Sequence, residues 1–273
     1  MSIATVRDQP PSGLSTWERF SWAVIDAWTM ARRNLRHIPR NPELLLDVTV
    51  QPVIFVLLFR YVFGGAIHVP GTSYVNYLMA GIFVQTIVFS SLSTGIGLSN
   101  DLKLGLIDRF RSLPMSRSAV VAGRTVTDLL RGMLAVTIML VVGLAVGFRP
   151  HGSVTGWLAG LGLLLLFGFA LSWIGVAAGV LLRTPEAVQA DLFIAVFPLT
   201  FASSAFVPTD TMPSWLRAFA AHQPMTQVVN ALRAFILGQP VGSYAWQSLA
   251  WGLGILIIFV PLSVTLYQRK AGQ

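Results

Sequence analysis

The sequence predicts an all-α integral membrane protein: six transmembrane helices, an N-terminal amphipathic helix in the membrane interface, and short re-entrant helices before the last span. Three observations support this fold class. Of the 273 residues, 54% are hydrophobic and only 11% are charged, whereas soluble domains carry roughly a quarter charged residues. Several apolar runs reach the length of about 20 helical residues that a bilayer requires. Basic residues gather in short segments between these runs, where they fix orientation.

The composition excludes several other classes. The net charge of +8 predicts no nucleic-acid partner here, because the cations flank apolar runs and do not form one patch. The absence of cysteine excludes disulfides, thiolate metal sites and cysteine nucleophiles. The four histidines form no metal-binding spacing, and we expect no metal site: they are His37, His68, His151 and His222.

Residues 1–43 are expected to form a cytosolic N-terminus that contains the amphipathic helix. This stretch has no apolar core of the kind a signal peptide needs, so we expect it to stay attached. One side of the helix is aromatic and the other is basic, which favours the headgroup plane; packing against a soluble partner is the alternative. The predicted interfacial residues are Trp17, Phe20, Trp28, Arg32, Arg33 and Arg36.

The transmembrane domain is expected to extend over residues 44–267. Glycine and proline clusters separate its apolar runs, as at Gly64-Gly65 and in the turn from Arg149 to Gly152. The third helix is expected to start near Ser118. The apolar spans are predicted at about 44–63, 74–98, 132–148, 154–182, 187–206 and 246–267.

Charge asymmetry predicts the orientation. Of the 19 lysines and arginines, 15 lie in the N-terminus, the segment 100–131, the segment 183–187 and the tail 268–273. The positive-inside rule makes this side cytosolic and puts both termini there. The opposite side holds the segment 208–240, whose two helical pieces are too short to cross alone. We expect them to be re-entrant or interfacial.

The segment 100–114 is predicted to be a short cytosolic helix between the second and third spans. Ser99 or Asn100 suits its N-cap and Pro114 its end. One face is apolar and the rest is charged, which indicates a docking element; a helix resting on the lipid surface is the alternative. The predicted docking residues are Asp101, Lys103, Asp108, Arg109, Phe110 and Arg111.

The same segment carries a family resemblance. Asp-Leu-x-x-Gly-x-x-Asp-Arg-Phe-Arg-Ser-Leu-Pro-Met-x-Arg, followed by Ala-Val-Val-Ala-Gly-Arg from residue 119, resembles the signature of type 2 ABC exporter permeases, in particular the daunorubicin-resistance permeases. The stretch 203–216 is similar to that family's outer segment. The resemblance implies a pair of permeases, two identical copies or two related chains, on two ATP-binding subunits. It also implies that residues 101–113 contact those subunits and that the helix at 17–36 lies on the cytosolic membrane surface.

The chain has no Gly-x-x-x-x-Gly-Lys-Ser/Thr loop to cradle nucleotide phosphates. We therefore expect no catalytic residue and no cofactor in this chain, with ATP and Mg bound by the partner subunit. Nucleotide-driven closure of the partners would then move the short cytosolic helix and tilt the spans between inward and outward access.

Phenylalanines in the spans are candidates for a path for an apolar substrate, although most phenylalanines in a span face lipid or neighbouring helices. The candidates are Phe55, Phe59, Phe83, Phe89, Phe193, Phe197 and Phe201. Ionisable residues in a span are functional candidates by default. Arg124, Asp128 and Arg131 are spaced to pair along one helix; Asp47 and Asp191 either pair with cytosolic arginines or face a water-filled cavity.

These observations predict a multi-pass permease of the bacterial cytoplasmic membrane, surrounded by lipid, that exports a hydrophobic antibiotic, drug or lipid-like metabolite. Two alternatives come from other classes. An ion-driven secondary transporter would need charged or unwound sites in the middle of the membrane. A membrane-embedded lipid-modifying enzyme would need an acid, base or metal cluster at a membrane surface.

Overall fold

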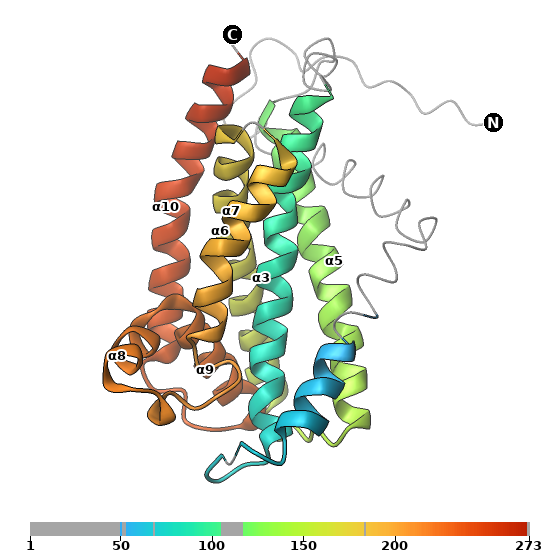
Figure 1. The fold of residues 1–273 in the computed structure, drawn as a ribbon, viewed down its shortest axis with the longest axis vertical. Helices are drawn as coiled ribbons and strands as arrows, with labels where there is room; N and C mark the ends of the chain where they lie inside the picture. Colours follow the sequence, from blue (N-terminus) through green and yellow to red (C-terminus); the bar gives the residue numbers. More distant parts are fainter. Residues whose placement is uncertain (1–49, 51–52, 68, 105–116, 183, 272–273) are drawn as a thin grey trace, which may run out of the picture.

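The computed structural model describes residues 50, 53–67, 69–104, 117–182 and 184–271, and these residues contain helices and no strand. Long helices lie side by side along the long axis of the molecule (Figure 1). The long helices are α3 (Tyr74–Lys103), α5 (Arg117–Ala145), α6 (Val154–Leu181), α7 (Pro185–Phe201) and α10 (Tyr244–Ala271). The short ones are Val53–Phe63, whose last turn is the π-helix η2 (Phe59–Phe63), then η3 (Thr209–Thr211), α8 (Ser214–His222) and α9 (Pro224–Leu237).

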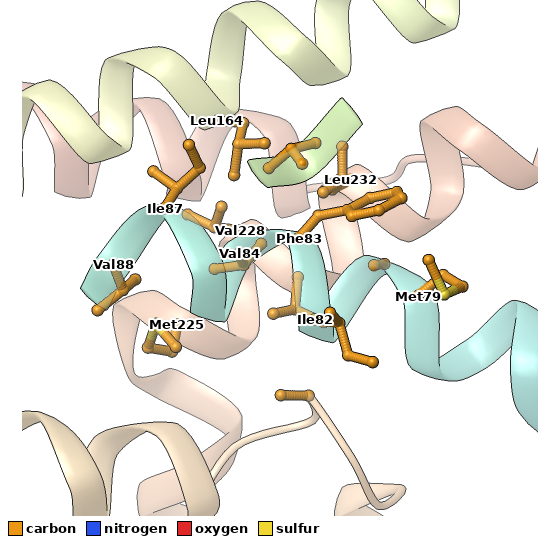
Figure 2. Close-up of a cluster of buried hydrophobic side chains, with 14 of the residues drawn as sticks. Met79, Ile82, Phe83, Val84, Ile87, Val88, Leu164, Met225, Val228 and Leu232 are labelled. Atoms are coloured by element: carbon orange, nitrogen blue, oxygen red, sulfur yellow. The ribbon is translucent and has the colours of Figure 1, made fainter. Parts of the chain in front are cut away.

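Helix α3 is the centre of the bundle. It packs against α5, α6, α7 and α9, and most of its apolar stretch is buried, whereas little of the apolar stretch of α10 is buried. Figure 2 shows how side chains of α3, α6 and α9 meet in this core. Phe83, Ile87, Leu164 and Leu232 are all almost fully buried there. Because lipid is as apolar as these side chains, close packing and not water exclusion holds such helices together.

Four of the described helices are long and apolar enough to cross a membrane: α3, residues 125–145 of α5, α6, and residues 244–267 of α10. Each agrees with a predicted span. The predicted first span is represented by the shorter apolar helix Val53–Phe63, which ends at the predicted glycine pair. The predicted fifth span corresponds to α7, which has 17 residues.

Helix α7 ends earlier than predicted. It stops at Phe201, and residues 202–206 form a turn where the sequence predicted continued helix. Polar groups of α9 and its N-terminal flank satisfy the turn: the Gln223 side chain donates to the carbonyls of Leu199 and Ala202 at 2.8 and 2.6 Å. Apolar composition alone did not reveal these partners.

The end of α3 also differs from the prediction. The sequence predicted a new helix beginning at Ser99 or Asn100, but α3 continues without a break to Lys103. Ser99 is buried in the bundle, and Asn100 accepts a backbone hydrogen bond from Leu104, so neither residue acts as an N-cap. Residues 1–49 and 105–116, with the predicted amphipathic helix and most of the predicted docking helix, lie outside the described residues.

The segment between α7 and α10 contains two helices, as predicted. Pro224 begins α9, and Gly238 ends it in the left-handed conformation with φ 68°. Both helices lie at one end of the bundle, where α3, α6 and α10 begin (Figure 1). Helix α9 packs against α3, α6 and α10, so it is an integral part of the bundle and not a surface appendage.

Candidate functional site

A row of phenylalanine rings connects the helix 53–63 with α7. The ring of Phe59 stacks on Phe206 at 4.5 Å between centroids, and Phe206 lies 5.2 Å from Phe201. The row continues along α7 through Phe197, at 4.4 Å from Phe201, to Phe193, at 5.2 Å from Phe197. Its ends reach Phe89 of α3, Phe55 and Phe63.

Helical spacing produces this row. Residues 193, 197 and 201 are four apart and share one face of α7, as 55, 59 and 63 do on their helix. The α7 rings are exposed by 40–49%, whereas Phe206 is only 4% exposed. The row is therefore open along α7 and enclosed where it passes to the helix 53–63.

The structure brings together six of the seven phenylalanines singled out in the sequence and places Phe83 elsewhere. Phe83 is 1% exposed and packs edge-on against Phe148 in the core, with centroids 6.3 Å apart. Sequence reasoning missed Phe63 and Phe206. The four-residue spacing from Phe59 was the available signal for Phe63, but Phe206 joins the row only because α7 ends at Phe201 and the chain turns back.

Asp191 lies on α7 just before the row. It is exposed, as are Phe193 and Ile194 beside it. The residue is six positions past Pro185, about 9 Å along the helix. Asp191 points away from Phe193, because residues two apart on a helix do not share a face. A carboxylate directed at hydrocarbon is costly, so the side of α7 that carries Asp191 is better suited to a protein partner or a polar space than to lipid.

A polar cluster joins α3 to α5. Asp128 is 5% exposed and accepts a hydrogen bond from the Thr94 hydroxyl at 2.7 Å on Oδ2. Arg131 lies 3.8 Å from its other oxygen, which confirms the predicted pairing of these two residues along one helix. Ser90 donates to the Asp128 carbonyl at 2.8 Å. The side chain of Arg124, the third residue of the predicted group, lies outside the described part, as does Asp47.

Only part of the predicted docking surface is described. Asp101 and Lys103 occupy the last turn of α3, and Lys103 pairs with Glu186 at the start of α7 across 3.9 Å. Both partners are exposed, so the pair contributes little to stability. The predicted residues outside the described part are Asp108, Arg109, Phe110, Arg111 and all six residues of the interfacial helix: Trp17, Phe20, Trp28, Arg32, Arg33 and Arg36.

No cluster of three or more histidine, aspartate or glutamate side chains that would suit a metal ion occurs within the described ranges. The candidate site is a row of apolar rings, which suits the binding of an apolar molecule.

Comparison with known proteins identifies the family. The model of the family "ABC-2 type transporter" matches residues 26–237. The daunorubicin resistance ABC transporter permease protein DrrB1 of Streptomyces coeruleorubidus is 34% identical over 98% of this chain and 96% of its own length. The doxorubicin resistance ABC transporter permease protein DrrB of Mycobacterium tuberculosis is 28% identical, with 89% of both chains covered. The putative transport permease ycf38 of Porphyra purpurea is 24% identical over 78% of this chain and 75% of its own. The chain therefore belongs to the ABC-2 type transporter family and is the permease subunit of an ATP-binding-cassette transporter.

Proposed function

We propose that this permease exports a hydrophobic small molecule, such as an antibiotic, drug or lipid-like metabolite, across the bacterial cytoplasmic membrane. The observation that carries the proposal is the row of phenylalanine rings, open along α7 at Phe193, Phe197 and Phe201. Two of the relatives are named for resistance to daunorubicin and doxorubicin, and such a function would require a surface that binds apolar, ring-containing compounds.

Ring-on-ring contacts make this row suitable for transient binding. Each offset or edge-on aromatic pair contributes about 0.5–1.5 kcal/mol beyond area burial. Neighbouring rings 4.4–5.2 Å apart along α7 present a succession of similar contacts. A substrate that moves from one ring to the next would bind each with a similar free energy, which favours passage over retention.

The exposed face of α7 also supports a pair of permeases, formed by a second copy or by a related chain. Asp191 on this face would be costly against lipid. Across a two-chain interface it would face either the partner or a hydrated path between the chains.

The proposed topology has six spans and both termini in the cytosol, with α8 and α9 as outer re-entrant helices. Lysines and arginines support this orientation. Helices α3 and α10 end at the same end of the bundle (Figure 1), and their last turns carry Lys103 and Arg269. Helices α8 and α9 lie on the other side. The residues between α3 and α5 begin and end on the basic side, which fits contact with two ATP-binding subunits that hold ATP and Mg.

The test is reconstitution of the permease with its ATP-binding subunit in proteoliposomes that contain daunorubicin. The expected result is drug movement that requires ATP and stops when the ATP-binding subunit is made unable to hydrolyse it. Drug movement by the permease alone, driven by a proton gradient, would instead establish a secondary transporter. ATP hydrolysis without movement of daunorubicin or any other tested apolar compound would reject the proposed substrate class.

A further inference from the structure

Arg233 of α9 is a buried cation that ties three parts of the bundle together. It is 7% exposed. Its Nε donates to the Tyr77 carbonyl of α3 at 3.1 Å, its Nη2 to the Ser204 carbonyl at 2.7 Å, and its Nη1 to Asn230 Oδ1 at 2.7 Å. The guanidinium also lies over the Tyr77 ring, 3.5 Å from the centroid.

The stability of the bundle does not by itself explain why a charged residue occupies position 233. A buried charge carries a desolvation cost of several kcal/mol, and the partners named above are neutral oxygens and one ring. Even a complete buried ion pair can often be replaced by well-packed apolar side chains without loss of stability, so a buried charge is weak evidence for a stabilising role. What the guanidinium offers instead is geometry, because its planar fork of donors reaches carbonyls on two separate segments at once.

One of those segments is the turn 202–206. The backbone N–H of Ser204 donates to the Thr226 hydroxyl at 3.1 Å, and the Ser204 hydroxyl donates to Asn230 Oδ1 at 2.8 Å. On the other side, Gly81 of α3 lets the turn approach, since any side chain at residue 81 would overlap the Ala205 carbonyl. The turn is thus clamped between α9 and α3.

Phe206 is the last residue of the clamped turn. This ring, stacked on Phe59 at 4.5 Å and 5.2 Å from Phe201, is the enclosed part of the phenylalanine row. Movement of the Ser204 backbone would displace Phe206 two residues later. The hydrogen bonds of Arg233 and the contact between Phe206 and Phe59 therefore form one mechanical unit.

We propose that Arg233 is a positioning residue for transport: it locks the turn 202–206 so that Phe206 closes the row against Phe59, and release of this lock opens the row toward the outer end of the bundle. The inference rests on the proposed export function. The substrate contacts the rings and not Arg233, which acts on the path through Ser204 and Phe206.

The positional test uses the absence of cysteine from the chain. The double variant Phe59→Cys, Phe206→Cys, purified with the ATP-binding subunit and without nucleotide, should be cross-linked readily by a short bifunctional maleimide. Adding Arg233→Met should lower the cross-linking yield several-fold. Adding Arg217→Met, the same change at an exposed arginine of α8, should leave the yield unchanged. Asn230→Ala serves as a second lock variant if Arg233→Met does not give a monodisperse protein.

The transport test uses variants that keep both phenylalanines. Arg233→Met should lower the number of daunorubicin molecules moved per ATP hydrolysed several-fold, while the drug concentration that half-saturates the ATPase stays unchanged. Arg233→Lys, which keeps the charge, should recover part of the loss. Equal cross-linking in the Arg233→Met and Arg217→Met backgrounds would overturn the lock. Reduced cross-linking with unchanged coupling would overturn its role in transport. If the unmodified complex moves no drug, the export proposal fails, and the cross-linking comparison still decides whether Arg233 positions Phe206.

Discussion

Gly95 of α3 and Gly175 of α6 face each other so closely that a side chain at residue 95 would overlap the Gly175 carbonyl oxygen. One turn further along α6, a side chain at Gly179 would overlap the carbonyl of Gly95 itself. The backbones of the two helices are therefore in direct contact. Small residues at such crossings let membrane helices gain van der Waals contact, which is a main source of their association.

Gly95→Ala is expected to destabilise the bundle, because the methyl group meets backbone that cannot rotate away. Overpacking of this kind costs about 1–3 kcal/mol. Thermal unfolding of the detergent-solubilised protein measures the effect. The matched control is Gly162→Ala on α6, where an added methyl group meets nothing within 4 Å. Equal unfolding temperatures for the two variants would contradict the close crossing.

The positions of the spans could be read from the sequence because turn residues interrupt the apolar runs. Gly64-Gly65, the segment from Arg149 to Gly152, and Gly238 all lie between helices in the structure. The packing faces could not be read in the same way. Apolar residues lie on every side of helix α3, so no stripe identifies its partners. The 24 glycines in the chain do not reveal which one meets Gly175.

The candidate site was predicted only in part, because the sequence does not show which distant residues pack together. The rings of α7 were identified because they belong to a predicted span. The turn that brings in Phe206 depends on polar partners that lie more than 20 residues later in the chain. Sequence reasoning did not single out Arg233, which lies in the segment 208–240. Its signal was available, because it lies four residues after Val229 and three before Ile236, on the apolar side of α9.

The hydrogen bond between Thr94 and Asp128 is expected to couple α3 to α5. In a double-mutant cycle with Thr94→Val and Asp128→Asn, we expect an interaction free energy of about 1.5–3 kcal/mol, as for hydrogen bonds to charged groups. Chemical unfolding of the four proteins provides it. Thr137→Val, which removes a hydroxyl that bonds only within α5, combined with Asp128→Asn should give no interaction. An interaction free energy of zero between Thr94→Val and Asp128→Asn would rule out the coupling.

Phe197→Ala should weaken drug recognition without unfolding the protein, because its ring is 43% exposed. We expect a several-fold rise in the daunorubicin concentration that half-saturates the ATPase of the reconstituted complex, with little change in unfolding temperature. Phe83→Ala is the contrasting variant: removing this core ring should cost about 3–5 kcal/mol of stability. If Phe197→Ala changes stability and leaves drug dependence unaltered, the row is a packing feature and not a path.

Reversing charge at Arg109 and Arg111 to glutamate should reduce binding of the ATP-binding subunit, since the predicted docking segment would lose its cations. Co-purification of the two subunits measures the association, and unfolding temperature checks that the spans are intact. Arg269→Glu makes a like change at an exposed position of α10 on the same side of the bundle and should leave association unchanged. If the double variant still binds the ATP-binding subunit fully, docking depends on another segment.

Single cysteines should resolve the orientation of the bundle, because the chain has none of its own. Ser214 begins α8 at one end and Arg269 lies near the end of α10 at the other, and both are exposed. We expect a membrane-impermeant maleimide to label Ser214→Cys in intact cells and to label Arg269→Cys only after the membrane is permeabilised. The physical reason is the excess of lysine and arginine on the α10 end, which holds that end in the cytosol. The reverse labelling pattern would put the segment between α3 and α5 outside the cell, where no ATP-binding subunit could reach it.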